Sequence, residues 1–162
     1  MVTDLKYGVA GLEQSGGASL CKFKITDAKL GKVQLGVGAP YPFTFELTVT
    51  VEKSYLGDLQ KGQKLTVFGG IKSGDASYLI GKEYVSFVQF SQPVTQLWNY
   101  WTFLVCEDGT LVSPFGCPVE EEEQAQGRSL DCRNYTGQKL DYFVGVVKDL
   151  IKEVRSESDS AQ

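Results

Sequence analysis

The sequence predicts a mainly β protein: a small, closed or partly open Greek-key barrel of about five to seven strands, with a helix at its C-terminal end. Residues 43–51 alternate between apolar and polar side chains without a miss, which is the period of a half-buried strand. Similar runs follow between turns rich in glycine and proline. A helical spacing of apolar residues is strongest near the end of the chain.

The first strands are expected after a short N-terminal arm. Residues 1–19 are predicted to be loosely structured or a short helix that ends in a glycine-rich joint. Cys21, Phe23 and Ile25 then alternate with polar residues, so all three are expected to point inward from one strand. A connection containing glycine and proline leads into residues 43–51, which predicts a hairpin with a long loop.

The remaining strands are separated by turn residues. We expect strands over residues 64–68 and 84–90, and a longer one over residues 97–106. The sequence Glu-Asp-Gly at residues 107–109 is strong turn chemistry, so residues 110–113 should pair back along the chain.

The C-terminal helix is predicted from apolar residues that recur at steps of three and four: Leu140, Phe143, Val147, Leu150, Ile151 and Val154. Thr136 is the expected N-cap, and Gly145 weakens the helix modestly. The chain is therefore interpreted as an arm at residues 1–19, one domain at 20–155 and a disordered tail at 156–162. The helix is expected to pack on the barrel, with a partner or membrane-surface helix as the alternative.

Composition narrows the possible functions. The chain has no histidine, which removes serine and cysteine triads and imidazole-based zinc sites. Its acidic residues are scattered except for the run at residues 120–123, which is typical of a solvated loop. The net charge of −4 argues against a nucleic-acid partner. We therefore expect a non-enzymatic protein without cofactor or metal.

Targeting signals give two further expectations. No run approaches the ~20 apolar residues of a membrane span, so none is predicted. The first residues lack the apolar segment of a signal peptide, and the alternative that Met1 replaces a removed signal stays open.

Cysteines and a sequon favour secretion. The four cysteines are widely spaced and predict two disulfides, with buried free thiols as the alternative: Cys21, Cys106, Cys117 and Cys132. Asn134 begins an N-glycosylation sequon two residues after the last cysteine. The pairing of Cys106 with Cys117 is disfavoured, because an extended strand would separate them by far more than the ~7 Å that a disulfide spans. Of the other two schemes, we prefer Cys21 with Cys106 and Cys117 with Cys132.

Three segments resemble the netrin-like domain, which the tissue inhibitors of metalloproteinases share. They are residues 45–67 with the exit Tyr-Leu-Gly, residues 79–84 with Gly-Lys-Glu-Tyr, and residues 107–117 with Asp-Gly-Thr-Leu before a cysteine. The resemblance covers about residues 20–117 and implies an OB-type barrel, secretion and a protein partner. The family's inhibitors bind the protease zinc through a mature N-terminal cysteine. Here the first cysteine is Cys21, so that activity would need processing to expose it.

Aromatic residues mark the expected partner surface: Tyr41, Trp98, Tyr100 and Trp101. The alternative places Trp101 and Phe103 in the core, with Trp98 and Tyr100 covering a barrel end. The sequence is therefore compatible with three functions: a secreted module that binds or inhibits a protein, a lipocalin-like barrel for a small apolar ligand, and an extracellular matrix component. The partner and the oligomeric state are not predicted.

Overall fold

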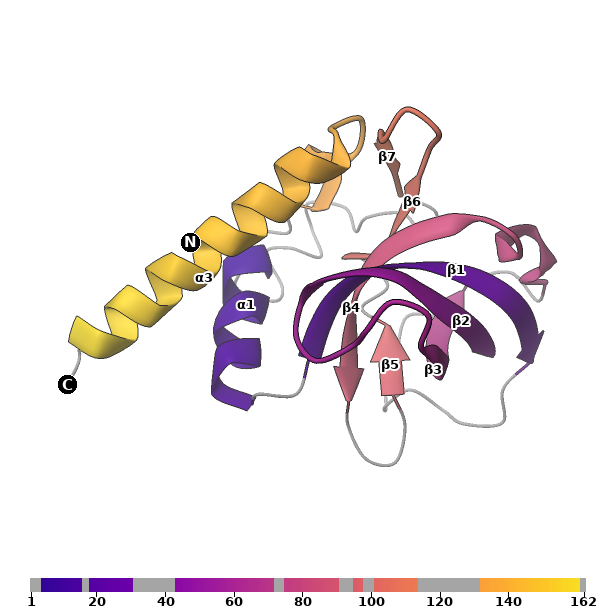
Figure 1. The fold of residues 1–162 in the computed structure, drawn as a ribbon, viewed down its shortest axis with the longest axis horizontal. Helices are drawn as coiled ribbons and strands as arrows, with labels where there is room; N and C mark the ends of the chain where they lie inside the picture. Colours follow the sequence, from indigo (N-terminus) through magenta and orange to yellow (C-terminus); the bar gives the residue numbers. More distant parts are fainter. Residues whose placement is uncertain are drawn as a thin grey trace.

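The computed structural model describes residues 4–15, 18–30, 43–71, 75–90, 95–97, 101–113 and 132–160. Strands occupy the middle of the chain, and a helix lies near each end (Figure 1). The prediction of a mainly β protein with a C-terminal helix is confirmed.

One seven-stranded sheet forms the body of the protein, with the strand order β1-β2-β3-β5-β4-β6-β7. The first strand also pairs with the fourth. The strands are β1 (Ala18–Leu30), β2 (Phe43–Leu56), β3 (Lys64–Ile71), β4 (Glu83–Phe90), β5 (Thr95–Leu97), β6 (Phe103–Val105) and β7 (Leu111–Val112). A short 3-10 helix, η1 (Ser77–Leu79), precedes β4.

Antiparallel pairing between β1 and its two neighbours organises the sheet. Phe23 lies opposite Val51 of β2 and opposite Tyr84 of β4. The predicted hairpin pairing of the first two strands is therefore confirmed. The contact between β3 and β5 is parallel and joins Phe68 to Gln96.

The single long strand expected over residues 97–106 is wrong, because β5 and β6 are separate. Leu97 packs inside the sheet, whereas Phe103 packs on the opposite side, so the chain changes sides between them. The fully buried hydroxyl groups of Ser86 and Thr102 lie 2.6 Å apart and satisfy each other near this crossing.

Two apolar layers lie on opposite faces of β1 and β4. We call the first the inner layer; its buried residues come mainly from alternate positions of the strands and include Cys21, Phe23, Ile25, Leu47, Val49, Val67, Tyr84 and Val88. We call the second the helix layer; its buried residues include Leu5, Val9, Leu20, Val85, Phe87, Trp101, Phe103, Tyr135, Phe143 and Val147.

The helix layer is covered by α1 (Asp4–Ser15) and α3 (Leu140–Ser160), which lie together on one side of the sheet (Figure 1). The Lys6 ammonium group joins the two helices by ion pairs of 2.7 Å to Glu153 and 2.8 Å to Glu157. The predicted packing of the C-terminal helix against the strands is confirmed, because Phe143 of α3 is buried with Val85 and Phe87 of β4. The tail expected to be disordered at residues 156–162 is instead helical as far as Ser160, because α3 continues to that residue.

The N-terminal end of α3 is held by the turn between β6 and β7. The amide of Leu140 donates to the Gly109 carbonyl at 2.9 Å, and the Lys139 ammonium donates to the Asp108 carbonyl at 2.8 Å. The expected N-cap at Thr136 is wrong, because the helix begins four residues later and the hairpin satisfies its first amide. Among the described helices, none combines the length and apolar composition that a bilayer crossing requires.

Candidate binding groove between β2 and α3

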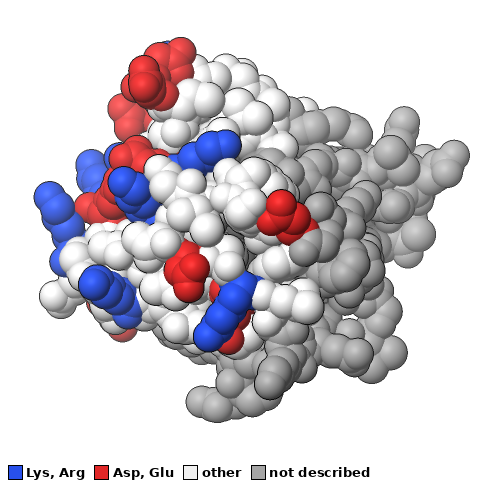
Figure 2. Space-filling model, turned by 90° about the vertical axis from the view of Figure 1, so that its right-hand side faces the viewer, with Lys and Arg blue, Asp and Glu red and all other residues white. Residues whose placement is uncertain are grey.

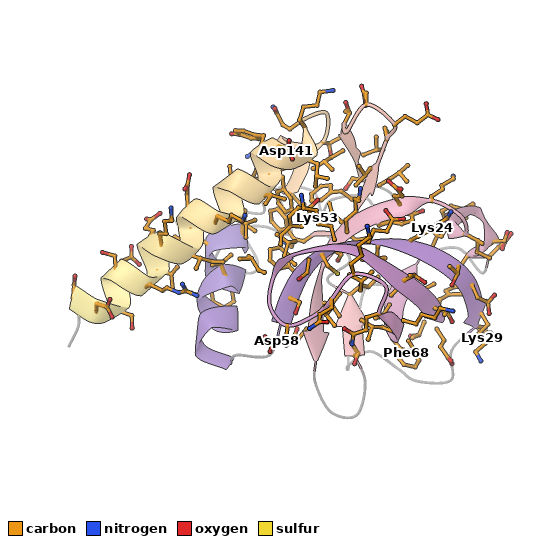
Figure 3. The ribbon with its side chains drawn as sticks, in the orientation of Figure 1. Lys24, Lys29, Lys53, Asp58, Phe68 and Asp141 are labelled. Carbon is orange, nitrogen blue, oxygen red and sulfur yellow. The ribbon has the colours of Figure 1, made fainter. Side chains whose placement is uncertain are left out.

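A groove of about 320 Å³ lies between the end of β2 and the N-terminal half of α3. One wall comes from β2 and the other from α3: Lys53, Ser54, Tyr55, Asp141, Val144, Gly145 and Lys148. Figure 3 shows Lys53 at the part of the sheet that meets α3 and Asp141 on the first turn of that helix. Lys24, Lys29 and Phe68 lie farther along the sheet in the same view.

The β2 wall is shaped by a bulge. Leu20 pairs with Leu56 and Cys21 pairs with Ser54, which leaves Tyr55 as the extra residue of β2. A bulge bends its strand and re-aims a side chain. The Tyr55 ring packs against the helix layer as a partly buried side chain, so the bulge brings a phenol to the groove.

The exit from β2 fixes this wall. Gly57 has a φ of 90°, and a Cβ atom there would lie 2.9 Å from the Cα atom of Ser19. Only glycine adopts this conformation easily, and only glycine allows so close an approach to β1. The end of β2 is therefore held against β1 immediately after the bulge.

The α3 wall is a stripe along one helix face, because its four lining residues are spaced three, one and three apart. The stripe extends for about 10 Å from Asp141 to Lys148, at about 1.5 Å of rise per residue. Val144 is buried between them. Gly145 carries no side chain, and a Cβ atom there would meet nothing within 4 Å.

The groove is lined by charged side chains of both signs. Within the described residues, no ion pair involves Lys53, Lys148 or Asp141. The Lys53 ammonium lies 5.3 Å from the centroid of the Tyr55 ring, a cation–π arrangement. Burial, followed by the negative charge of Asp141, raises the pKa of Tyr55, so its hydroxyl stays neutral near neutral pH. Two cations, one carboxylate and a phenol thus line the groove.

Two lysines elsewhere on the sheet pair with nearby carboxylates. Lys22 lies 3.7 Å from both Glu52 and Glu83, and Lys29 lies 3.3 Å from Glu46. On the face of the molecule shown in Figure 2, basic and acidic side chains interleave over the described surface, and neither sign forms a large patch. Among the described residues, Lys53 and Lys148 have no such partner, as is also true of Lys24 and Lys64, and the groove is distinguished by holding two such lysines on its two walls.

The predicted aromatic surface is only partly covered by the structure. Tyr41, Trp98 and Tyr100 lie outside the described residues. Trp101 is 3% exposed and stacks on Phe143, with ring centroids 6.3 Å apart and ring planes 8° apart. The expected partner-binding role of Trp101 is therefore corrected to a core role, because the helix layer covers its ring.

The predicted pair between Cys21 and Cys106 is wrong, since both are free thiols. Cys21 points into the inner layer, whereas Cys106 lies at the turn after β6 and donates its amide to the Thr110 carbonyl. Burial raises the pKa of the Cys21 thiol to about 12. Cys132 is buried and disulfide-bonded. Its pairing with Cys117 stays a prediction, because Cys117 lies outside the described residues.

Asn134, the predicted glycosylation residue, is exposed on the 3-10 helix η3 (Cys132–Tyr135). No group of three or more histidine, cysteine or acidic side chains in the described ranges is arranged to hold a metal ion. Comparison with protein-family models found no match, and a search of curated proteins found no significant relative.

Sequence reasoning missed the groove as a site. The one sequence signal is Gly145, a weak helix former within the helical pattern beside Val144 and between Asp141 and Lys148. The sequence does not show that β2 ends opposite this stripe. That placement depends on the bulge at Tyr55 and on the packing of α3.

Proposed function

We propose that the chain is a secreted, non-enzymatic, netrin-like module that binds a protein partner through the groove between β2 and α3. The observation that carries the proposal is an open concavity lined by a partly buried tyrosine and by two lysines that form no ion pair with any described residue. Tyrosine side chains and charged groups that can pair with a partner are features of recognition surfaces.

An OB-type Greek-key barrel is the architecture that we propose for the sheet. The pairings run from β1 through β2, β3, β5 and β4, and β4 pairs again with β1. This order, with one parallel contact between β3 and β5, supports a barrel rather than an open sheet. The resemblance of the strand motifs to netrin-like domains agrees with this proposal.

Secretion is supported by the exposure of Asn134 and by the disulfide-bonded state of Cys132. Protease inhibition through Cys21 is not part of the proposal. The Cys21 side chain has no exposed surface and lies in the inner layer, so it cannot reach a zinc ion from this position.

A protein partner is favoured over a small apolar ligand. The space inside the sheet is occupied by large side chains that are buried, including Phe23, Leu47 and Tyr84. The groove lies outside the sheet, is open to solvent and is lined by charged groups. An apolar ligand would leave those charges unpaired, whereas a segment of a protein can satisfy them.

Expression of the full chain behind a secretion signal in eukaryotic cells tests localisation. We expect secreted protein whose mass falls after deglycosylation, and no such fall for Asn134→Gln. A chain that is retained without glycan, with all its cysteines reduced, would contradict secretion.

Capture from extracellular fluid tests binding. Immobilised chain should retain a protein that mass spectrometry identifies and that binds again after purification. The variant Lys53→Glu/Lys148→Glu should lose it. The control Lys64→Glu/Lys82→Glu changes charge equally at exposed lysines outside the groove and should retain it. Equal retention by both variants would contradict the groove as the binding site.

A further inference from the structure

Resting on that proposed function, we infer the chemistry of the segment that the groove takes: an extended peptide with neighbouring acidic side chains and, about three residues away, a basic one. The acidic residues would meet Lys53 and Lys148. The basic residue would meet Asp141. The inference rests on the residues that line the groove and on their spacing along α3.

The first argument is charge. Lys53 and Lys148 stand on different walls of one groove, and no carboxylate in the described part of the chain forms an ion pair with either. A carboxylate placed between the walls could accept hydrogen bonds from both ammonium groups. The Tyr55 hydroxyl supplies a neutral donor or acceptor beside them.

The second argument is the missing side chain at Gly145. A glycine inside an exposed stretch of helix destabilises it relative to alanine, and no protein atom lies within 4 Å of a Cβ built at this position. Packing within the chain therefore does not require glycine here. The residue instead leaves the groove open between Asp141 and Lys148, where a peptide backbone can approach the helix.

The third argument is the separation of charges along the groove. Asp141 and Lys148 are two helical turns apart, about 10 Å along the axis. Three residues of an extended chain cover about the same length, since each advances roughly 3.3 Å. A peptide lying along α3 can therefore pair a basic residue with Asp141 and an acidic residue with Lys148.

Asp141 also favours a peptide of mixed charge over other anionic ligands. A uniformly charged polyanion, such as a sulfated polysaccharide, would place negative charge against this carboxylate. A free carboxylate or phosphate ion would fill a small part of a groove of about 320 Å³ and would not need the gap at Gly145. A peptide of mixed charge uses every lining group.

Fluorescence polarisation with the full chain tests the inference. The probe is a labelled Glu-Glu-Gly-Gly-Arg peptide, together with the reversed sequence because the direction of binding is not fixed. We expect saturable binding by one of them. Replacing both glutamates by glutamine should weaken that binding about tenfold or more, which is the loss of charge-assisted hydrogen bonds.

Matched variants then test the groove itself. Lys53→Glu/Lys148→Glu should weaken binding about tenfold more than Lys64→Glu/Lys82→Glu. Gly145→Leu should also weaken it about tenfold. Gly11→Leu is the control, because Gly11 is another exposed helical glycine with nothing within 4 Å of an added Cβ. Circular dichroism verifies that each variant is folded.

A swap of charge gives a gain of binding that misfolding cannot imitate. Asp141→Lys should bind Glu-Glu-Gly-Gly-Glu more tightly than Glu-Glu-Gly-Gly-Arg, in the better direction of the two, and so reverse the native preference. An unchanged preference, absent saturable binding, or equal effects of the groove and control variants would overturn the inference. Tighter binding of dextran sulfate that Gly145→Leu does not weaken would also overturn it, in favour of a polysaccharide.

These outcomes separate the inference from the proposed function. A captured protein that the groove variants lose, but that the peptide does not displace, would overturn only the peptide chemistry. If the peptide binds as expected but no protein is captured, only the proposed partner function would be overturned.

Discussion

The inner layer and the helix layer use opposite faces of the same strands, but they are built differently. In the inner layer, neighbouring strands contribute alternate residues such as Phe23, Val49 and Tyr84. The helix layer gathers aromatic rings from segments far apart in the chain. Phe143 of α3 is its centre, with ring contacts to Phe87, Trp101, Phe103 and Tyr135.

The difference indicates which layer holds the strands together and which layer positions the groove. The inner layer holds the strands in register, because each residue packs against its cross-strand neighbours. The helix layer places α3 on the sheet and thereby sets the second wall of the groove. Damage to the helix layer should therefore affect the site more than equal damage to the inner layer.

The largest effect is expected for Phe143→Ala. The ring is fully buried, so its removal should lower the free energy of unfolding by about 3–5 kcal/mol. Tyr142→Ala, at a neighbouring residue that is 55% exposed, is the control and should change it far less. Urea denaturation measures both. Similar losses for the two variants would mean that the rings do not hold α3.

A second, smaller effect distinguishes the contact between β1 and β2. Gly57 and Gly62 have φ values of 90° and 89°, so alanine is strained at both. Only at Gly57 would the new Cβ meet the Ser19 backbone. Gly57→Ala should therefore cost about 1–3 kcal/mol more than Gly62→Ala in the same denaturation experiment. Equal costs would show that the close approach to Ser19 is unimportant.

Alkaline pH should weaken the inner layer. Burial raises the pKa of Cys21 from 9.0 to about 12 and that of Tyr84 from 10.0 to about 12. Each group is then protonated in the folded chain but ionised in the unfolded chain above pH 9 or 10, so stability falls as the pH rises through that window.

The contribution of Cys21 can be measured separately. Between pH 9 and 10, the free energy of unfolding should fall about 1 kcal/mol more for the native chain than for Cys21→Ala. Thiol labelling at pH 8 should modify Cys106 well before Cys21, which is fully buried. Equal pH slopes or rapid labelling of Cys21 would contradict the burial of this thiol.

The smallest effect is expected at the surface between the helices. Lys6→Met removes two exposed ion pairs between α1 and α3 but keeps the apolar part of the side chain. The melting temperature should fall slightly at low salt and match that of the native chain at high salt. A large, salt-independent fall would mean that Lys6 packs as well as pairs.

The inner layer could be predicted from sequence because a period of two is a local signal. The inward positions of Cys21, Phe23 and Ile25 are confirmed. The break between β5 and β6 could not be predicted, because Leu97 and Trp101 look alike in a strand pattern and only tertiary packing sends them to different layers.

The site was less accessible to sequence reasoning than the fold. Aromatic residues are expected to mark the binding surface, but the ring of Trp101 packs in the helix layer, which agrees with the alternative that places it in the core. The groove depends on polar residues of β2 and α3 that are about ninety residues apart in the chain and meet only after the bulge at Tyr55 forms. No local periodicity encodes such a meeting.

The central claim is that the groove between β2 and α3 is a binding site. The most direct measurement is the dissociation constant of the Glu-Glu-Gly-Gly-Arg peptide, in its better direction, for Gly145→Leu compared with Gly11→Leu. Binding about tenfold weaker for Gly145→Leu, with both variants folded, is the predicted result. Equal dissociation constants would contradict the claim, because the filled groove would then be irrelevant to binding.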